Sequence, residues 1–255
     1  METMEHPIIL TIAGSDPSGG AGIQADIKTI SALGGYAATA ITALTVQNTL
    51  GVTQSQPVAP DILRAQLEAV LSDLTVDAVK IGMLATAENV AVVAEMLQKY
   101  PVKHVVCDPV ILSTSGHELL SRQGVELAKE CLFPLCTLIT PNLPEATFLI
   151  GDGAQLSSMF QTAVLVKGGH AEGDTMTDTL YEQGQIHPFS SSKIVTTNLH
   201  GTGCTLSSAI ATYLALGHDL KSSVKKSKEY IFRCIEAAVD LGVGHGNGPL
   251  WHFPR

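Results

Sequence analysis

The sequence predicts an α/β protein with three layers, in which helices cover both faces of a central, mostly parallel sheet. Short apolar runs alternate with longer segments of helical period along most of the chain. The apolar runs are nearly continuous, which is typical of strands buried on both faces. With 255 residues, of which 45% are hydrophobic and 15% charged, the chain can also bury a large core. We therefore expect one domain over residues 1–255.

The first strand and helix illustrate the pattern. Residues 8–13 form an apolar run, and residues 22–33 place Ile23, Ile27 and Ile30 on one helical face. The same alternation predicts further elements in the first half of the chain. We expect strands at 37–44, 78–81 and 104–107, and helices at 61–74 and 89–98.

The second half continues the alternation and then changes character. Helices are expected at 123–132 and 144–150, with strands at 138–140 and 163–166. Residues 178–188 carry a Gly184 turn between two runs of mixed polarity, which predicts a hairpin at an edge of the sheet. Two helices follow at 205–216 and 220–241, and the glycine-rich residues 242–249 fit neither helix nor strand.

Charge and composition exclude several classes of protein. The formal net charge of −9 gives no general field that would attract nucleic acid or an anionic membrane. Residues 1–7 lack a basic region, and no run of about 18 apolar residues predicts a membrane span. The five cysteines contain no CxxC pair, which argues against disulfides and structural zinc. We expect a cytoplasmic protein without nucleic-acid or membrane partners.

A glycine-rich turn precedes the helix expected at 205–216. It consists of Gly201, Thr202, Gly203, Cys204 and Thr205. The first N–H groups of a helix lack internal partners and carry partial positive charge, so glycines there allow a phosphate to approach the backbone. This turn, called the glycine turn below, therefore predicts a site for a transferred phosphoryl group. The structural alternative is an ordinary helix start with a threonine cap.

Cys204 lies in the first turn of that helix. A thiol pKa of about 8.5 can fall toward neutrality at a helix N-terminus, which would make Cys204 a proton acceptor or a partner for a substrate hydroxyl. The alternative is a small buried hydrophobic residue, which is what most free cysteines are.

Residues 14–22 join the first strand to the first helix and contain several glycines suited to close contact with a ligand. Gly14 and Gly19 have the spacing of a P-loop. However, Gly20 and Ala21 stand where that motif requires lysine and a hydroxyl residue, and no GxGxxG is present in this loop. P-loop and dinucleotide-binding proteins are therefore disfavoured.

Three further residues are candidates for the crevice at the strand ends. Asp26 lies in the first helix, Gln47 follows the second strand and Met83 follows the third. The structural alternatives are a solvated helix face for Asp26, turn chemistry for Gln47 and core packing for Met83.

Two strand ends carry groups that suit a nucleotide. Asp108 ends the run 104–107, where a carboxylate could meet a magnesium–phosphate group. Lys167 ends the run 163–166 and precedes Gly168 and Gly169, which suits a phosphate. A surface lysine beside a turn is the alternative.

Asn142 and Glu145 follow the strand at 138–140. They could serve a nucleotide at that strand end. The local sequence favours the structural alternative, an N-cap at Asn142 with Pro144 in the first turn and Glu145 near the helix dipole.

Together, these motifs closely resemble the hydroxymethylpyrimidine/phosphomethylpyrimidine kinases of thiamine biosynthesis, within the ribokinase-like superfamily. The match spans nearly the whole chain, and several long motifs in fixed order make it specific. The resemblance implies a ribokinase-like fold. It is carried by residues 11–26, 46–49, 80–84, 140–146, 167–170 and 200–205.

The resemblance implies a two-step phosphoryl transfer. ATP would phosphorylate the hydroxymethyl group of 4-amino-5-hydroxymethyl-2-methylpyrimidine, and a second ATP would convert the monophosphate into the diphosphate. Mg²⁺ would accompany ATP, and a homodimer is the family expectation.

The resemblance also implies roles for individual residues. Most ribokinase-like sugar kinases have an aspartate base where this sequence has Cys204. The catalytic group would be Cys204 with the anion-hole residues Gly201, Thr202 and Gly203. The pyrimidine pocket would be lined by Gly14, Asp26, Gln47 and Met83. ATP and its magnesium would be bound by Asn142, Glu145, Lys167 and Thr205. Asp108 is a second candidate ligand for the magnesium, besides Glu145.

Two alternative functions remain open from the sequence. The nearest is a pyridoxal or pyridoxine kinase, or an enzyme with both activities. Residues 46–49 favour the aminopyrimidine, because B6-specific relatives depart from this segment. A non-catalytic small-molecule sensor is the second alternative, and loss of the anion-hole glycines or the nucleotide residues would have supported it. This sequence keeps both.

Overall fold

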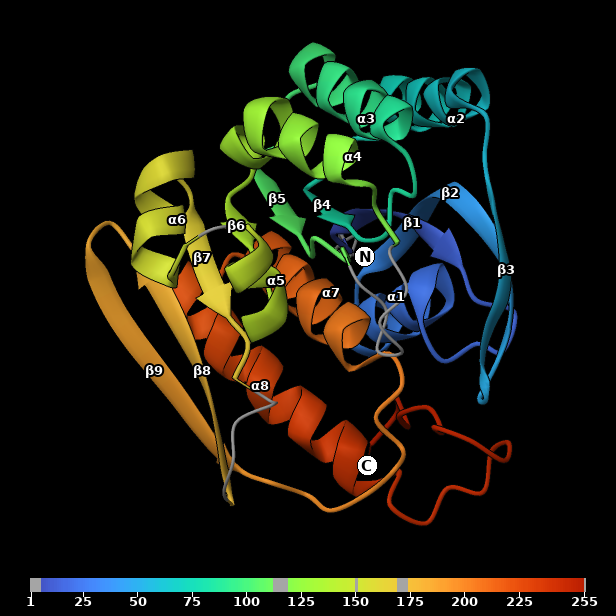
Figure 1. Ribbon diagram of the computed structural model, residues 1–255, viewed down its shortest axis with the longest axis vertical. Helices are drawn as coiled ribbons and strands as arrows, with labels where there is room; N and C mark the ends of the chain where they lie inside the picture. The colour runs from blue at the N-terminus through green and yellow to red at the C-terminus, as the bar shows by residue number, and fades with distance from the viewer. Residues whose placement is uncertain (1–5, 112–118, 150, 169–173, 255) are drawn as a thin grey trace, which may run out of the picture.

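A computed structural model describes residues 6–111, 119–149, 151–168 and 174–254 (Figure 1). These residues form a 9-stranded sheet in the order β3-β2-β1-β4-β5-β6-β7-β8-β9. The six adjacent strands β2, β1, β4, β5, β6 and β7 run parallel to one another. The strands β3, β8 and β9 are antiparallel to their neighbours. The strands are β1 (Ile8–Ser15), β2 (Tyr36–Asn48), β3 (Gly51–Pro57), β4 (Ala78–Ile81), β5 (His104–Cys107), β6 (Leu138–Ile139), β7 (Ala163–Val166), β8 (Thr175–Glu182) and β9 (Gln185–Ser192).

Helices cover both faces of this sheet, which confirms the predicted fold class. In Figure 1, α2, α3 and α4 lie together on one side, and α1, α7 and α8 lie on the other. The helices are α1 (Gly22–Ala32), α2 (Pro60–Asp73), α3 (Ala87–Lys99), α4 (Arg122–Leu127), α5 (Leu143–Phe148), α6 (Gly153–Phe160), α7 (Thr202–Ala215) and α8 (Leu220–Glu236).

Each face has its own apolar core. The first includes Leu67 of α2 and Val93 of α3, packed against Ile12 and Ile81 of the sheet. The second includes Ile210 of α7, Ile30 of α1 and Val224 of α8. They pack against strand side chains, such as Ile9, that point to the other face of the sheet. Because successive residues of a strand point to opposite faces, one apolar strand supplies both cores.

The structure differs from the prediction mainly at an edge of the sheet. The second strand extends to Asn48 and turns back into β3, which the sequence pattern did not predict. The segment Thr53–Gln56 is polar and exposed, so β3 lacks the apolar alternation that identifies a strand. Gly51 adopts a φ of +146° at the turn.

Other differences concern helices. α6 was not predicted, and it begins with a capping box between Asp152 and Gln155. The helix predicted at 123–132 divides into α4 and a π turn, Ala128–Leu132. α8 ends five residues before the predicted end at 241. The hairpin of β8 and β9 is confirmed, with β9 at the sheet edge.

The glycine-rich segment at 242–249 is irregular, as predicted, and it joins distant parts of the chain. Asn247 donates its backbone N–H to the Thr49 carbonyl at 2.8 Å, beside the turn between β2 and β3. The His200 N–H donates to the Gly248 carbonyl at 3.0 Å. Within the described ranges, every helix is too short or too polar to cross a bilayer.

Candidate active site

The glycine turn opens α7 in a conformation that favours glycine. Gly201 is the N-cap of α7 and has a φ of +85°. A Cβ at Gly201 would collide with the carbonyl oxygen of Gly20, so the turn packs directly on the loop after β1. The alternative of a threonine cap is wrong. In the described structure no side chain caps α7, and the Thr202 hydroxyl donates to the Leu199 carbonyl.

The second glycine of this turn lies against an ion pair. Lys167 Nζ is 2.7 Å from Asp108 Oδ1. A Cβ at Gly203 would lie 2.9 Å from Asp108 Oδ2 and 3.4 Å from Lys167 Nζ. Burial lowers the pKa of Lys167, but the charges of Asp108 and Glu145 outweigh it and raise that pKa. The structure therefore gathers a helix start, a carboxylate and an ammonium that are far apart in sequence.

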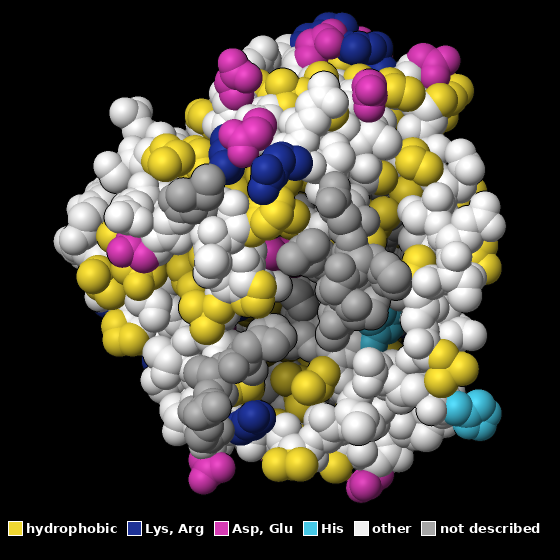
Figure 2. Space-filling model, viewed as in Figure 1, with side chains coloured by type: hydrophobic (Ala, Val, Ile, Leu, Met, Phe, Trp, Pro, Cys, Tyr) yellow, Lys and Arg dark blue, Asp and Glu magenta, His cyan; other side chains and the backbone are white. Residues whose placement is uncertain are grey.

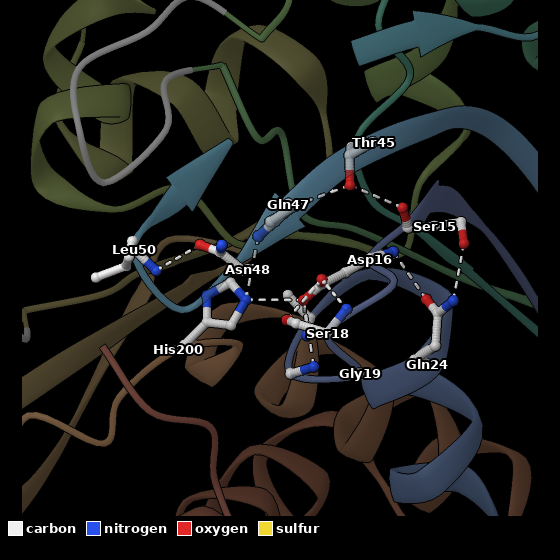
Figure 3. A network of polar contacts seen from close by, with 12 residues as sticks. Ser15, Asp16, Ser18, Gly19, Gln24, Thr45, Gln47, Asn48, Leu50 and His200 are labelled. Carbon is white, nitrogen blue, oxygen red and sulfur yellow. Dashed lines mark hydrogen bonds and ion pairs between the residues drawn. The ribbon is translucent and has the colours of Figure 1, made fainter. Parts of the chain in front are cut away.

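The loop between β1 and α1 is organised around one carboxylate, Asp16 (Figure 3). Asp16 is buried and accepts hydrogen bonds from the backbone of Ser18, Gly20 and Ala21, and from the Ser18 hydroxyl. His200 Nε2 lies 2.8 Å from Asp16 Oδ2. Burial raises the pKa of Asp16, but the bonds from His200 and Ser18 outweigh burial and lower it to about 2. This carboxylate therefore joins the loop to the residue before the glycine turn.

Gln47 faces the same histidine. Its Nε2 is 3.2 Å from His200 Nε2, and its Oε1 accepts a hydrogen bond from Thr45 at 3.1 Å. An ionised carboxylate only accepts hydrogen bonds, so His200 Nε2 carries the proton that is directed to Asp16. That nitrogen cannot then accept from Gln47. The Thr45 hydroxyl also lies 2.9 Å from the Ser15 carbonyl, so its single proton is shared between that oxygen and Gln47 Oε1.

Asp26 lies beneath the site. Its side chain has no exposed surface, and it forms an ion pair of 2.9 Å with Lys80, which is equally buried. Thr11 and Ser208 donate their hydroxyls to Asp26 at 2.6 and 2.7 Å. Burial lowers the pKa of Lys80, but the Asp26 charge outweighs it and raises that pKa. A direct contact between Asp26 and a substrate would therefore require this ion pair to rearrange.

Two other predicted pocket residues are neighbours. A Cβ at Gly14 would lie 3.5 Å from the Met83 sulfur, in ordinary van der Waals contact. Met83 is half-buried, and its carbonyl accepts a hydrogen bond from Thr42. The Lys80 ammonium lies close under the same segment, because a Cβ at Gly82 would be 2.8 Å from Lys80 Nζ. Gly14 and Met83 thus meet above the buried ion pair.

Asn142 and Glu145 form the predicted N-cap. The Asn142 side chain accepts from the Glu145 N–H at 2.8 Å, and Glu145 Oε2 accepts from the Asn142 N–H at 3.0 Å. Glu145 Oε1 accepts from the Ile111 N–H at 3.0 Å. Burial raises the pKa of Glu145 despite the nearby charge of Lys167. Both oxygens of this carboxylate are thus committed to the backbone in this conformation.

Thr205 is also more buried than expected for a ligand contact. It has no exposed surface, and its hydroxyl lies 3.1 Å from His252 Nε2. Burial lowers the pKa of His252 to about 4, so the imidazole is neutral near pH 7. The Thr205 side chain therefore cannot contact a nucleotide in this conformation, and the Thr205 N–H donates to the Gly201 carbonyl at 2.9 Å.

Cys204 is half-buried in the first turn of α7. The expected fall of its pKa is wrong. Burial raises the pKa of Cys204, and the charges of Asp26 and Asp108 add to this effect, while Lys80 opposes it. The thiol is therefore neutral near pH 7 and can donate or accept a hydrogen bond.

Two carboxylates near the glycine turn, those of Asp108 and Glu145, are candidate ligands for Mg²⁺. In phosphoryl-transfer sites this ion is usually held by one or two carboxylates together with substrate phosphates. Asp108 fits, because Oδ1 pairs with Lys167 while Oδ2 faces the Gly203 side of the turn. Glu145 fits less well, since both of its oxygens accept backbone N–H groups. The described ranges contain no group of three or more metal-ligating side chains.

The surface charge agrees with local rather than general anion binding. On the face shown in Figure 2, Lys and Arg side chains gather mainly over α3 and α4, intermixed with Asp and Glu. Lys167 instead meets Asp108 within the site, where 16% of its side chain is exposed.

Sequence reasoning missed the individual parts played by Asp16, Lys80 and His200. All three lie in segments that carry the family resemblance, namely 11–26, 80–84 and 200–205. Considered alone, each resembles an ordinary polar residue. Their partners lie 184 residues away for Asp16 and His200, and 54 residues away for Lys80 and Asp26. Gly169 and His170, which belong to the predicted Lys167 motif, lie outside the described residues.

Comparisons with known proteins identify the family of this chain. A family model described as phosphomethylpyrimidine kinase matches residues 16–251. A hydroxymethylpyrimidine/phosphomethylpyrimidine kinase of Rhizobium meliloti is 46% identical over 260 residues, which cover 97% of each chain. A thiamine biosynthesis bifunctional protein of Geobacter sulfurreducens is 46% identical over 96% of this chain. The matched region spans only 52% of that relative.

Two solved structures extend the comparison. A phosphomethylpyrimidine kinase of Clostridium difficile has a TM-score of 0.80 and 41% identity, covering 90% of this chain and 99% of that one. A pyridoxal kinase of Bacillus subtilis, solved as an ADP complex, has a TM-score of 0.89 and 33% identity, covering 98% of each.

The sheet order, the glycine turn and the ion pair beside it define a small-molecule kinase with a ribokinase-like fold, for which ATP is the co-substrate. Within that class, the chain belongs to the phosphomethylpyrimidine kinase family.

Proposed function

We propose that this protein phosphorylates 4-amino-5-hydroxymethyl-2-methylpyrimidine to its monophosphate, and then phosphorylates the monophosphate to the diphosphate. The names and coverage of its relatives support this reaction sequence, which belongs to thiamine biosynthesis. The observation that carries the proposal is the approach of Gly203 to both members of the Lys167–Asp108 pair. This arrangement supports a phosphate held between backbone donors and a fixed cation.

The first step is a direct transfer. The hydroxymethyl oxygen attacks the γ-phosphorus of ATP, a new P–O bond forms, the bond to the β–γ bridging oxygen breaks, and ADP leaves. The hydroxyl proton passes to water or to an oxygen of the transferred phosphoryl group as the new bond forms. Gly201 and Gly203 would stabilise the charge on the transferred group through backbone N–H donors. The Thr202 N–H, which donates to the Leu199 carbonyl at 3.3 Å, would join them once that contact opens. Such transfers depend mainly on positioning and charge neutralisation, so they need no strong base.

Cys204 would orient the accepting hydroxyl. Because burial raises the pKa of its thiol, a neutral Cys204 next to the anion-binding turn is a hydrogen-bond partner rather than a preformed base. After the first transfer, the monophosphate itself supplies an anionic nucleophile for the second step. That step has no hydroxyl proton to remove when the accepting phosphate oxygen is ionised.

The pyrimidine would be held by Gln47, Met83 and Gly14. The Gln47 side chain lies between Thr45 and His200, and an amide can both donate to and accept from the ring's amino and nitrogen groups. Close packing of Met83 and Gly14 supports a flat apolar surface for the ring. Asp26 would support this surface from beneath through Lys80, and a direct contact would follow only if the pair rearranged.

Lys167 would contact the ATP phosphates, and Asp108 would hold Mg²⁺ together with those phosphates. When bound, Mg²⁺ neutralises phosphate charge and aligns the transferred group. Asn142 would support the nucleotide side through the capping box. Thr205 would support it by holding the glycine turn, because its N–H donates to the Gly201 carbonyl at 2.9 Å. Glu145 is the second candidate for the ion, and it would first have to release a backbone N–H.

Further properties of the whole protein belong to the same proposal. A continuous sheet supports one domain over residues 1–255. The five free cysteines support a reducing, cytoplasmic environment. We also propose a homodimer without nucleic-acid or membrane partners, which light scattering and a filter-binding assay would test.

One assay tests the substrate. Purified protein is incubated with ATP and Mg²⁺ and, in separate reactions, with hydroxymethylpyrimidine, its monophosphate or pyridoxal, and the products are resolved by mass. Monophosphate and diphosphate of the pyrimidine are expected. Formation of pyridoxal phosphate alone would overturn the proposed substrate, and failure to form diphosphate from the monophosphate would remove the second step.

Pyridoxal phosphorylation is the second candidate activity. It is favoured by the TM-score of 0.89 to the Bacillus subtilis pyridoxal kinase, which exceeds that to the Clostridium difficile enzyme. Sequence identity favours the pyrimidine, at 41% against 33% for the same two structures. Product formation from both compounds would identify a dual-activity enzyme.

A further inference from the structure

Asp178 occupies a buried position on β8, next to the strand that carries Lys167. β8 pairs antiparallel with β7, with Thr179 opposite Val166. The two carboxylate oxygens of Asp178 serve two different donors. Oδ1 accepts from the Gly168 N–H at 2.8 Å, and Oδ2 accepts from Lys228 Nζ at 2.6 Å. Asp178 thus connects the residue after Lys167 to a cation.

That cation comes from α8, a helix that packs in the second core. Lys228 lies on α8, and only 11% of its side chain is exposed, so it is committed to this contact. A buried ion pair usually adds little stability over apolar residues of the same volume. Stability alone therefore does not explain why Asp178 and Lys228 are charged. Their geometry indicates a positional role, because the pair holds a carboxylate oxygen at the Gly168 N–H.

The backbone around Lys167 is held on both sides. The Lys167 N–H donates to the Pro141 carbonyl at 2.9 Å, and the following N–H, that of Gly168, donates to Asp178. Gly168 lies so close to β8 that a Cβ would collide with the Thr177 carbonyl oxygen. Fixing both peptide groups fixes the origin of the long Lys167 side chain, whose ammonium reaches Asp108.

We propose that Asp178, supported by Lys228, is a positioning residue that holds Lys167 in the orientation needed to bind ATP phosphates. The proposal rests on the proposed function in one respect, namely that Lys167 contacts the nucleotide. Asp178 acts through Lys167 and does not itself touch ATP. Its loss should weaken nucleotide binding and leave the pyrimidine side of the site unchanged.

The test measures binding of the non-hydrolysable analogue AMP-PCP with Mg²⁺ by calorimetry. Asp178→Asn keeps the volume, but its amide has one acceptor oxygen and cannot serve both Gly168 and Lys228. We expect the Kd for AMP-PCP to rise about tenfold, as for loss of a charge-assisted hydrogen bond. The Kd for hydroxymethylpyrimidine should change less than about twofold. Lys225→Met, at an exposed position on the same helix, is the matched control and should change neither Kd.

A double-mutant cycle separates positioning from general support of the fold. Lys167→Met alone should weaken AMP-PCP binding. If Asp178 acts through Lys167, adding Asp178→Asn to that background should weaken binding by less than about twofold more. A full, additive loss in the Lys167→Met background would overturn the inference. An equal loss of pyrimidine affinity in Asp178→Asn would also overturn it.

A second variant covers failure of Asp178→Asn to fold. Asp178→Leu combined with Lys228→Met replaces the pair with apolar side chains and leaves no unpaired buried charge. It should show the same loss of AMP-PCP affinity and the same lack of additivity with Lys167→Met, and unchanged affinity would overturn the inference. Absence of AMP-PCP binding by the unmodified protein would instead overturn the proposed function, and this inference with it.

Discussion

The Lys80 ammonium and the Asp26 carboxylate lie 2.9 Å apart, and neither side chain is exposed to solvent. The pair joins β4 to α1, while hydroxyls from β1 and α7 complete the carboxylate's hydrogen bonds. Four elements that form the floor of the candidate site therefore meet at one carboxylate. Removing either partner leaves a buried charge without compensation.

Lys80→Met should therefore destabilise the protein strongly. We expect the free energy of unfolding, measured by urea denaturation, to fall by about 3–5 kcal/mol. Lys80→Met with Asp26→Leu should recover only part of this loss, because no charge remains buried but the Thr11 and Ser208 hydroxyls lose their acceptor. The control is Lys99→Met, which breaks an exposed pair with Glu68 and should leave the free energy of unfolding nearly unchanged. A similarly small loss in Lys80→Met would contradict the buried geometry.

Gly201→Ala tests the glycine turn. The added Cβ would strain a φ of +85° and collide with the Gly20 carbonyl, which should displace the backbone donors of the turn. We expect kcat to fall by about 10²–10³, the effect of losing one oxyanion-hole donor. Gly217→Ala is a matched control. Gly217 has a φ of +88° near the other end of α7, but a Cβ there would meet open space. Equal losses of kcat in the two variants would show that strain alone is responsible.

Cys204 can be tested by two substitutions. Cys204→Ala should reduce kcat by about 10²-fold, within the range of a lost proton-transfer or hydroxyl-orienting group, with AMP-PCP affinity unchanged. If the neutral thiol orients the substrate hydroxyl, Cys204→Ser should retain more turnover than Cys204→Ala because serine keeps a hydrogen-bonding group. Equal defects would favour a thiolate base, and full turnover in the alanine variant would reduce Cys204 to packing.

Asp16 gives a prediction for acid stability. Its pKa is lowered to about 2 in the folded protein, whereas an unfolded aspartate has a pKa of about 3.9. The stabilisation is therefore complete above about pH 4 and is lost as the pH falls toward 2, with a size on the order of 2 kcal/mol. Unfolding free energies of the unmodified protein and Asp16→Asn should converge over this window. A difference that stays constant from pH 5 to pH 2 would refute this assignment.

Most of the parallel sheet could be predicted from the sequence, because its strands are short apolar runs. The bounds of β4, β5 and β7 are as expected. β3 could not be found in the same way, since its polar side chains face solvent at the sheet edge. The capping box of Asn142 and Glu145 was predictable because capping depends on local order along the chain.

The burial of the site residues could not be predicted from the sequence. A helical aspartate is usually solvated, so the sequence did not indicate that Asp26 is buried against Lys80. The sign of the Cys204 pKa shift was also wrong, because burial by the surrounding core outweighs the helix N-terminus. Both errors concern solvent exclusion, which depends on contacts between segments distant in sequence.

The contacts of residues 247–249 with Thr49 and His200 have a consequence for biosynthesis. During translation, the hairpin of β2 and β3 leaves the ribosome about 200 residues before the segment that docks beside it, a delay on the order of 10–40 s at typical elongation rates. The glycine turn is likewise held by a residue that emerges after α8. The candidate site is thus completed by a segment made about 200 residues after its first parts, so nascent chains would acquire ligand affinity only after residues 247–249 have left the ribosome.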